Sequence, residues 1–483
     1  MAPTAAAPRR ALHGRELPHV AVFPLMAKGH TIPLLDLACV LRRRGLAHVT
    51  FLTTPGNAPF VRAALAAGGA GDAAVVELPF PAGHRVPHAA GGGECAEGVA
   101  SASAFAAFAE AASLLRPQLE EALAAARPPV SLLVADGFLH WAHASVAALG
   151  VPRVSFLGTS AFAHVVREAC VRDRPGAAGA GAGASAATYT VPEFPHIRFS
   201  LADLVPPPLP MIELDAKMAV AVAGSHGIIM NTFDDLEGRY IEHWNRHIGP
   251  KVWPIGPLCL ARKSSSTREA HAKSSWMQWL DEKAANGRAV LYIALGTLAA
   301  IPEAQLKEVA DGLERAEVDF LWAVRPNNVD LGARYEERVA GRGKVVREWV
   351  DQREILHHMC VKGFLSHCGW NSVLESVSAG VPLAAWPIEF EQPINAKLVV
   401  DELRVGVRVY ASNGTVGGLV KSEEITRVVR ELMFGKAGTA MASRVAKIAA
   451  EAKMAVSDSG SSWKAVEGMI GELCVTKIAA NAM

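Results

Sequence analysis

Short apolar runs alternate with amphipathic segments along most of the chain. The first run covers residues 18–24, and similar runs follow at 49–54, 131–136 and 151–157. Runs that are apolar at nearly every position predict strands buried on both faces of a parallel sheet. A segment with apolar residues at helical spacing, 31–44, separates the first two runs. Strand, helix and strand in this order predict a series of βαβ units.

A second series of the same kind begins after residue 275. Apolar runs at 289–295, 320–324, 363–366 and 381–386 predict its strands. The two series predict an α/β fold with two Rossmann-like, doubly wound parallel-sheet domains that face each other across a cleft. In such folds, ligands bind at the carboxyl ends of the strands.

The domain boundaries follow from the same pattern. We predict a first domain at residues 1–259 and a second at 276–459, joined by the polar, Ser-rich linker 260–275. Apolar residues recur at helical spacing again at 460–475, which predicts a final amphipathic helix.

Composition excludes several classes of function. Lys and Arg total 48 against 47 Asp and Glu, and no basic stripe stands out, so we expect no nucleic acid partner. No apolar run approaches the roughly 18 residues that a transmembrane helix needs, so we expect no stable membrane insertion. The 7 cysteines lack paired spacing, and the N-terminus lacks the apolar core of a secretory signal. We therefore predict a cytoplasmic protein.

Polar residues follow the predicted strand 363–366. A glycine-containing turn occupies 367–370, and Asn371 and Ser372 are residue types that cap the N-termini of helices. The predicted helix ends at Gly380. A helix N-terminus presents free backbone N–H groups and the positive end of the helix dipole, so this segment predicts a phosphate-binding site.

The stretch from Trp349 to Gln392 resembles the signature sequence of plant UDP-dependent glycosyltransferases, glycosyltransferase family 1. The resemblance extends over nearly the whole chain. It implies the GT-B fold, in which the first domain binds mainly the acceptor and the second binds the sugar nucleotide. It also implies that the helix 460–475 crosses back onto the first domain. The implied reaction is transfer of a sugar, with inversion, from a UDP-sugar to a hydroxyl group of a small acceptor.

The resemblance implies which residues hold the nucleoside. Trp349 stacks on uracil with Val350 beside it, Gln352 holds the base, and Glu375 binds the ribose hydroxyl groups. Val350 and the aspartate after it depart from the family, which has a small residue and a proline there.

The resemblance also implies which residues hold the diphosphate and the sugar. The residues implied for the diphosphate are Thr297, His367, Asn371 and Ser372. Those implied for the sugar hydroxyl groups are Trp370, Glu391 and Gln392. Glu391 replaces the commoner aspartate, which keeps the carboxylate but adds a methylene. Trp370 and Gln392 resemble the glucose-preferring version of the family, which implies UDP-glucose as the donor.

A hydroxyl group is a poor nucleophile at neutral pH, so the transfer needs a positioned base. His30 lies at the carboxyl end of the first strand, just before a helix whose dipole disfavours an imidazolium ion. Asp136 ends a later strand of the same sheet and is placed to orient the imidazole. The family has its catalytic histidine and aspartate at these matching positions. The predicted catalytic pair is therefore His30 and Asp136.

Acceptor binding is expected in the first domain, with a contribution from the facing edge of the second. The candidate residues are Phe138, Trp141, Thr159, Phe162, Glu389 and Phe390. Each aromatic member is equally consistent with a place in the core. The resemblance implies a lipophilic plant metabolite, such as a flavonoid or another phenolic.

Two other functions compete with this one. A dinucleotide-dependent oxidoreductase needs a glycine fingerprint directly after the first strand, which residues 27–30 do not provide. A catalytically silent UDP-sugar binder would lack His30 or Asp136, and both are present. The sequence has none of the usual zinc spacings, so we expect no metal and no cofactor, and we expect a monomer.

Overall fold

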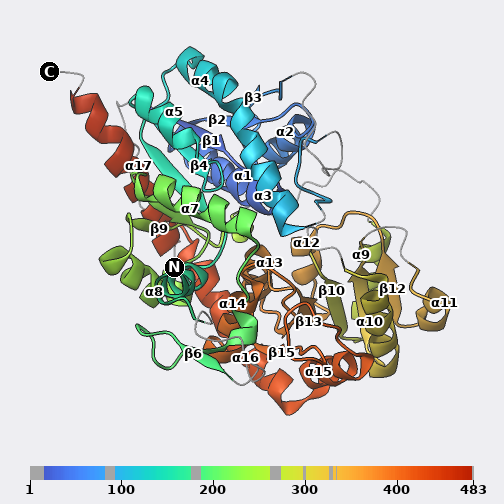
Figure 1. Cartoon of the computed structure of the whole chain (residues 1–483). Helices are drawn as coiled ribbons and strands as arrows, with labels where there is room; N and C mark the ends of the chain where they lie inside the picture. The colour runs from blue at the N-terminus through green and yellow to red at the C-terminus, as the bar shows by residue number, and fades with distance from the viewer. Residues whose placement is uncertain are drawn as a thin grey trace, which may run out of the picture.

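Two parallel sheets covered by helices form the molecule (Figure 1). The computed structural model describes residues 16–81, 93–99, 101–175, 187–261, 274–296, 301–325, 330–332 and 334–480. Thr297 and most of the predicted linker 260–275 lie outside the described residues. The domain boundaries therefore stay a prediction.

The first sheet has 7 strands in the order β3-β2-β1-β4-β5-β8-β9. Its strands are β1 His19–Phe23, β2 His48–Thr53, β3 Ala74–Glu77, β4 Leu132–Asp136, β5 Arg153–Leu157, β8 Ile228–Met230 and β9 Val252–Pro254. All neighbouring pairs are parallel, and β1 lies between β2 and β4. The carboxyl ends of β1 and β4 are therefore side by side.

Helices cover both faces of the first sheet. They are α1 Lys28–Arg43, α2 Ala58–Ala67, α3 Ala102–Ala111, α4 Arg116–Ala125, α5 Ala142–Ala148, α6 Ala161–Asp173, α7 Leu209–Ala223 and α8 Asp234–His247. A small hairpin of β6 Thr188–Thr190 and β7 Arg198–Ser200 lies outside the sheet. The Ala-rich helical segment 104–126 is broken between α3 and α4, where a 3₁₀ turn precedes Pro117. Proline lacks an N–H and fits best in the first turn of a helix, which is consistent with a new helix beginning there.

The second sheet has 6 parallel strands in the order β12-β11-β10-β13-β14-β15. Its strands are β10 Val290–Ala294, β11 Asp319–Ala323, β12 Gly343–Val346, β13 Val361–Ser366, β14 Leu383–Ala385 and β15 Gly406–Arg408. The longer helices beside it are α9 Ser275–Ala285, α10 Glu303–Ala316, α13 Trp370–Ala379, α15 Ser422–Phe434 and α16 Lys436–Ala455. The shorter ones are α11 Tyr335–Val339, α12 Gln352–Leu356 and α14 Gln392–Lys397.

The last helix, α17 Ser461–Ala480, returns to the first sheet, where it lies beside β9 (Figure 1). Trp463, Val466 and Met469 are buried in the same apolar cluster as α1 and β2. The Ser462 hydroxyl donates to the carbonyl of Gly256 just after β9. The first sheet therefore receives part of its core from the C-terminal end of the chain.

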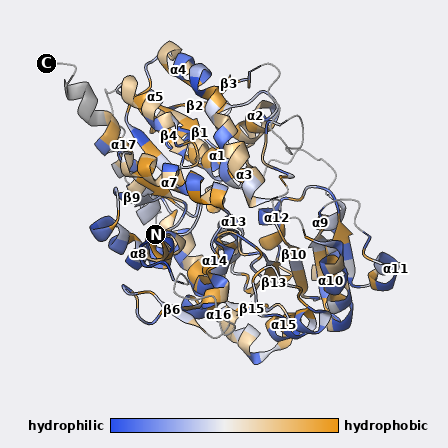
Figure 2. Ribbon diagram, in the orientation of Figure 1, coloured by the Kyte–Doolittle hydropathy of each residue, from blue (hydrophilic) through white to orange (hydrophobic). Residues whose placement is uncertain are grey.

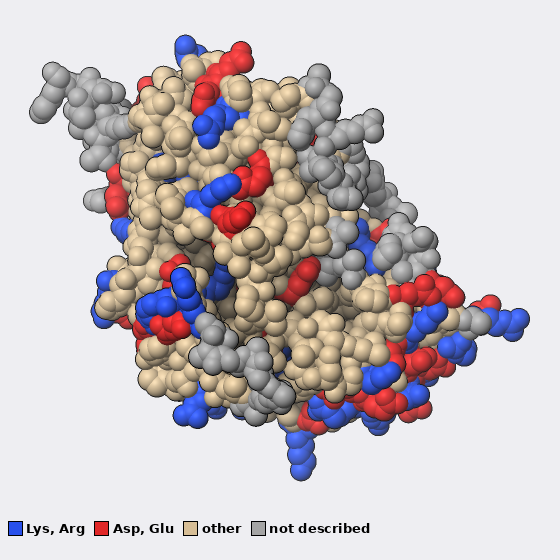
Figure 3. All heavy atoms as spheres, viewed as in Figure 1, with Lys and Arg blue, Asp and Glu red and all other residues tan. Residues whose placement is uncertain are grey.

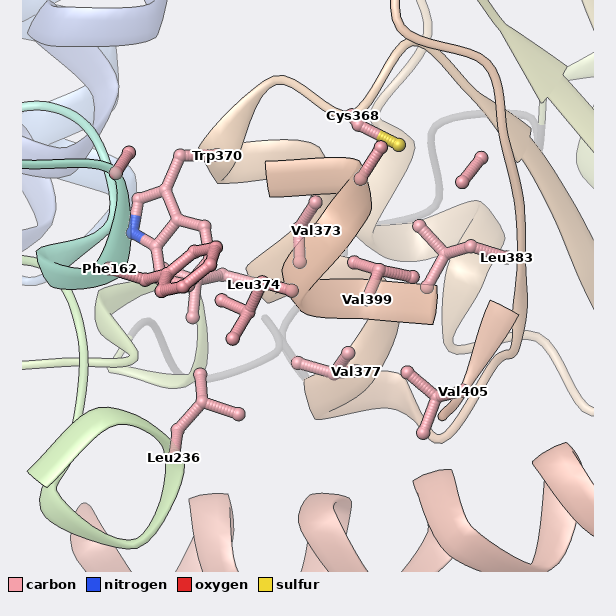
Figure 4. Close-up of a cluster of buried hydrophobic side chains, with 14 of the residues drawn as sticks. Phe162, Leu236, Cys368, Trp370, Val373, Leu374, Val377, Leu383, Val399 and Val405 are labelled. Carbon is pink, nitrogen blue, oxygen red and sulfur yellow. The ribbon is translucent and has the colours of Figure 1, made fainter. Parts of the chain in front are cut away.

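A shared apolar cluster joins the two halves (Figure 4). Phe162 and Leu236 come from helices of the first half, whereas Trp370, Leu374 and Val377 come from α13 in the second. Figure 2 shows that orange, hydrophobic stretches lie mainly along strands and inner helix faces. Burial of this apolar surface holds α13 at the junction of the two sheets.

The visible face carries charges of both signs (Figure 3). They gather at the lower right, over α10, α11 and α15, where ion pairs such as Arg338–Glu314 and Arg315–Glu423 join neighbouring helices. Within the described residues, no helix is both long and apolar enough to cross a bilayer.

Candidate active site

His30 and Asp136 are in contact at the carboxyl edge of the first sheet. The imidazole Nδ1 lies 2.7 Å from Asp136 Oδ2, and the Phe138 backbone N–H donates to Asp136 Oδ1 at 3.0 Å. Asp136 is only 1% exposed, whereas His30 is 16% exposed. Because Nδ1 faces the carboxylate, Nε2 is the nitrogen of His30 that is free to accept a proton.

The position of His30 in its helix differs from the prediction. α1 begins at Lys28 rather than Thr31, which puts His30 in the first turn and Pro33 inside the helix. In that turn, the carboxylate of Glu97 accepts the backbone N–H of Lys28 at 2.6 Å. The sequence offered no signal for this contact, since Glu97 lies in a loop far along the chain.

The pKa of His30 is shifted in the direction opposite to that expected from the helix dipole alone. Burial disfavours the charged imidazole, but the charge of Asp136 and its hydrogen bond outweigh burial, with help from Glu391 and Glu97. The pKa of His30 is therefore raised above the ordinary value of 6.5. Nearby carboxylates dominate here because they carry full charges, whereas a helix terminus carries about half a charge.

This raised pKa predicts the pH dependence of the transfer. Only neutral His30 accepts a proton, so the rate should rise with pH through a pKa above 6.5, the ordinary value for histidine. Asp136→Asn removes the charge that raises this pKa, so the acid limb should move to lower pH while the maximal rate falls. Measuring kcat/KM over roughly pH 5 to 9 tests this. An unmoved acid limb in Asp136→Asn would contradict the assignment.

Gly158 allows the strand β5 to approach the imidazole. A Cβ atom at this position would lie 3.3 Å from His30 Cε1 and 3.4 Å from Nδ1. That separation is closer than most side chains tolerate, so a larger residue would press on the ring. The site therefore depends on a glycine that the sequence pattern alone did not single out.

Two phenylalanines lie beside His30, and a third packs against one of them. The ring of Phe138 lies 5.6 Å from the imidazole and 5.3 Å from Phe105, which is itself 6.1 Å from Phe390 of the second half. Phe138 and Phe390 were expected in this wall, whereas Phe105 was not. Phe105 sits in an Ala-rich helix whose period gave no reason to separate it from the core. These rings form an apolar wall that spans both halves.

Two predicted members of the wall are instead core residues. Trp141 is 3% exposed and packs edge-on against Phe23 at 6.0 Å. Phe162 is fully buried against Tyr240 and Phe199. Both positions follow strand ends, but the first turns of α5 and α6 direct their side chains inward.

Carboxylates of the second half lie opposite His30. Burial raises the pKa of Glu391, and Arg167, His30 and the Thr159 hydroxyl oppose this shift. The pKa of Glu389 is also raised, by burial and then by Glu391. The side-chain carbonyl of Gln392 accepts the backbone N–H groups of Ile388 and Glu389 at 2.9 and 3.0 Å. Gln392 thus fixes the turn that carries both acids.

The helix α13 begins one turn after β13, but its N-cap is Gly369 rather than Asn371 or Ser372. Asn371 and Ser372 lie in the first turn instead. The side-chain amide of Asn371 donates to the carbonyl of Gly29 at 2.6 Å, which joins this turn to the residue before His30. The predicted end of the helix at Gly380 is confirmed, because Gly380 adopts a left-handed conformation with φ of 75°.

His367 precedes this turn and is uncharged. Burial lowers its pKa to about 4. Gly296 adopts φ of +88°, and a Cβ atom there would lie 2.9 Å from His367 Nε2. Only glycine tolerates both the positive φ and this contact, so the turn after β10 can lie against the imidazole. A neutral imidazole in this place offers an N–H donor rather than a positive charge.

Gln352 connects the residues expected to hold the nucleoside. Its amide nitrogen donates to Glu375 Oε2 at 2.7 Å and to Ser372 Oγ at 3.0 Å. Burial raises the pKa of Glu375 to about 7, against the opposing charge of Arg353 and the hydrogen bond from Gln352. Gln352 therefore lies beside two residues that are 20 and 23 positions further along the chain, Ser372 and Glu375.

Trp349 is 44% exposed at the edge of the second sheet. The Lys28 ammonium lies 3.7 Å from the centroid of its ring, and the Arg325 guanidinium lies 4.7 Å away. Val350 is 8% exposed and packs in the core, so contact of its side chain with a base is not possible without rearrangement.

The indole of Trp370 is already engaged within the protein. Trp370 is 2% exposed, and its indole N–H donates to the carbonyl of Asn231 at 2.8 Å (Figure 4). The indole therefore joins the two halves and has no free donor for a sugar hydroxyl. Its backbone N–H, in the first turn of α13, is the group left for a ligand.

Further polar contacts join the two halves. Arg353 Nη1 donates to Asp36 Oδ2 at 2.9 Å, with side chains 15% and 2% exposed. The Ser160 hydroxyl donates to Asn395 Oδ1 at 2.7 Å in a fully buried contact. The Asp36 pair links α1, the helix of His30, to α12, which begins at Gln352. A single contact between helices therefore connects His30 with the residues that are expected to hold the nucleoside.

Comparisons with known proteins agree with this geometry. Residues 243–436 match the family described as UDP-glucoronosyl and UDP-glucosyl transferase. The chain is 39% identical over 473 residues to UDP-glycosyltransferase 90A1 of Arabidopsis thaliana, covering 95% of this chain and 97% of that protein. It is 33% identical over 486 residues to UDP-glucose flavonoid 3-O-glucosyltransferase 7 of Fragaria ananassa, covering 94% and 96%.

Solved structures share the same architecture. The crystal structure of Glycyrrhiza uralensis UGT73P12 complexed with glycyrrhetinic acid 3-O-monoglucuronide superposes with a TM-score of 0.84 and 28% identity, covering 97% of this chain and 98% of that one. The fold is therefore GT-B, as the sequence predicted. The chain belongs to the plant UDP-glycosyltransferase family and is a glycosyltransferase. This family membership removes the dinucleotide-dependent oxidoreductase as an alternative.

Among the described residues, no group of three or more His, Cys, Asp or Glu side chains is placed to hold a metal ion. The independence of the reaction from metal stays a prediction, as do the cytoplasmic location and the monomeric state.

Proposed function

We propose that this enzyme transfers glucose, with inversion, from UDP-glucose to a hydroxyl group of a small lipophilic phenol. The observation that carries the proposal is the His30–Asp136 contact of 2.7 Å, beside three aromatic rings and opposite Glu391 and the N-terminus of α13. The naming of the Fragaria relative as a flavonoid 3-O-glucosyltransferase supports a phenolic acceptor and glucose as the sugar.

In the proposed reaction, His30 Nε2 accepts the proton of the acceptor hydroxyl group as its oxygen attacks the anomeric carbon. The new C–O bond forms as the bond from that carbon to the UDP oxygen breaks on the opposite face, which inverts the configuration. Asp136 stabilises the resulting imidazolium. UDP leaves with its negative charge against the first turn of α13, where free N–H groups and the dipole favour an anion.

The remaining residues are proposed to hold the donor. Trp349 stacks on uracil, and Gln352 and Glu375 bind the base and the ribose. Asn371, Ser372 and the neutral His367 donate to the diphosphate. Glu391 and Gln392 bind the sugar hydroxyl groups, and Thr297, outside the described residues, is proposed beside the phosphates.

A substrate panel tests this function. The purified protein is incubated with several UDP-sugars and several plant phenols, and the products are identified by mass. We expect hexose addition with UDP-glucose and no loss of activity after treatment with a chelator, because protein groups such as the first turn of α13, rather than a metal ion, stabilise the leaving group. Inhibition by chelator that one metal reverses would contradict the mechanism, and failure to bind UDP would overturn the function.

A further inference from the structure

The residue two places before the catalytic base contacts the other half of the molecule. Lys28 opens α1 in the first half, yet its Nζ lies 3.7 Å from the centroid of the Trp349 ring in the second. Arg325 lies over the same ring at 4.7 Å. Two cations thus converge on an indole that is proposed to stack on a neutral base.

The positive charge of the Lys28 ammonium is balanced only in part by its surroundings. It lies over the rings of Trp349 and Phe60, the second at 5.8 Å, and among the described residues no carboxylate oxygen is within ion-pair distance of it. Burial lowers the pKa of Lys28, Glu97 raises it, and Arg325 lowers it further. Glu97 itself accepts the backbone N–H of Lys28 at 2.6 Å. A partly desolvated ammonium of this kind gains from an added anion.

The side chains proposed to hold the phosphates supply no positive charge. His367 is neutral, with a pKa of about 4, and Asn371 and Ser372 carry no charge. Glu375, further along α13, is an acid whose charge is opposed by Arg353 rather than by a cation of the turn itself. The carbonyl of Gly29, which follows Lys28, accepts the side-chain amide of Asn371 at 2.6 Å. Lys28 is therefore one residue away from a direct contact with the turn expected to hold the diphosphate.

We propose that Lys28 is a donor-binding residue, which the acceptor-side half contributes to the phosphates of the UDP-sugar. When uracil takes its place on Trp349, the flexible Lys28 side chain turns from the ring to a phosphate oxygen. A charge-assisted hydrogen bond then replaces a cation–π contact, which is the weaker interaction at an exposed ring. This inference rests on the proposed function of the second half as the UDP site.

The contact would also make donor binding depend on both halves. Uracil and ribose contact only the second half in the proposed arrangement, whereas the phosphates would contact residue 28 of the first. We therefore expect Lys28 to discriminate UDP from uridine rather than to strengthen binding of the nucleoside.

Titration calorimetry with UDP and with uridine tests this on the full-length protein. Lys28→Met should weaken UDP binding about 10-fold, the usual loss for a hydrogen bond to a charged group, and leave uridine binding within about twofold. Lys28→Arg should recover most of the UDP affinity. The control is Lys362→Met, which removes the same charge from an exposed position at the amino end of β13, opposite the site. It should change neither affinity.

Each other outcome overturns the inference. Tighter UDP binding by Lys28→Met would mean that Lys28 only competes with uracil for Trp349. Equal losses of affinity for UDP and uridine would mean that Lys28 shapes the uracil site rather than binding a phosphate. Unchanged UDP affinity would mean that Lys28 does not contribute to donor binding. A wild-type protein that binds no UDP would instead refute the proposed function itself.

Discussion

Replacing His30 by alanine is expected to lower the rate of sugar transfer by about 10²–10⁴-fold, the usual contribution of a positioned base. UDP affinity should stay nearly unchanged, because the residues proposed to bind UDP lie almost entirely in the second half. The two quantities are measured separately, by single-turnover product formation and by titration calorimetry with UDP.

A matched control is His358→Ala. His358 also contacts a carboxylate, Asp281, at 3.2 Å, and its side chain is 10% exposed. It lies just before β13, at the amino ends of the strands of the second sheet, whereas His30 follows the carboxyl end of a strand of the first sheet. Its loss should lower stability at most and leave kcat near the wild-type value. Equal losses of transfer and UDP binding in His30→Ala would show that His30 is structural.

The second large effect is expected at the ion pair between Asp36 and Arg353. Arg353→Met removes the Arg353 cation from the Asp36 carboxylate, which is 2% exposed. Removing one member of a buried pair costs about 3–5 kcal/mol in the free energy of unfolding, because the remaining charge is still desolvated. Denaturant unfolding of the variant measures this cost.

The double variant Asp36→Leu with Arg353→Met measures how much of each loss in stability depends on the interaction between the two side chains. Because neither charge then remains, we expect the double variant to lose less stability than the two single variants together. The exposed pair Arg246–Glu242, with side chains 67% and 59% exposed, is the control and should contribute less than about 1 kcal/mol. Additive losses would mean that Asp36 and Arg353 do not depend on each other.

The sequence predicted the fold because its strands are buried on both faces. Runs such as 18–24 and 131–136 are apolar throughout, and β1 His19–Phe23 and β4 Leu132–Asp136 occupy them. The same pattern placed His30 and Asp136 at one sheet edge, since neighbouring parallel strands end together. Helix starts were less certain: α1 and α13 both begin before the predicted residue, because backbone geometry and distant contacts such as Glu97 decide them.

The site was predicted where a signature sequence fixes side chains and missed where tertiary packing decides. Gln352 and Glu375, both implied for the nucleoside, are in contact, and Ser372 lies beside them. Apolar residues after strand ends gave no means to separate core from cleft, so Phe162 was placed in the wall and Phe105 was not. Charges from the opposite half were equally invisible, because the contact between the halves is a property of the folded chain.

The return of α17 to the first sheet has a consequence for hybrid enzymes. Trp463, Val466 and Met469, with Ile470 and Cys474 of the same helix, complete a core whose remaining buried residues all lie at residue 261 or earlier. The contact between Ser462 and Gly256 illustrates this separation along the chain. A chimera spliced at the segment 260–275 would therefore cover its first half with a foreign helix. If α17 is exchanged together with that half, the helix and the sheet that it packs against come from the same parent enzyme.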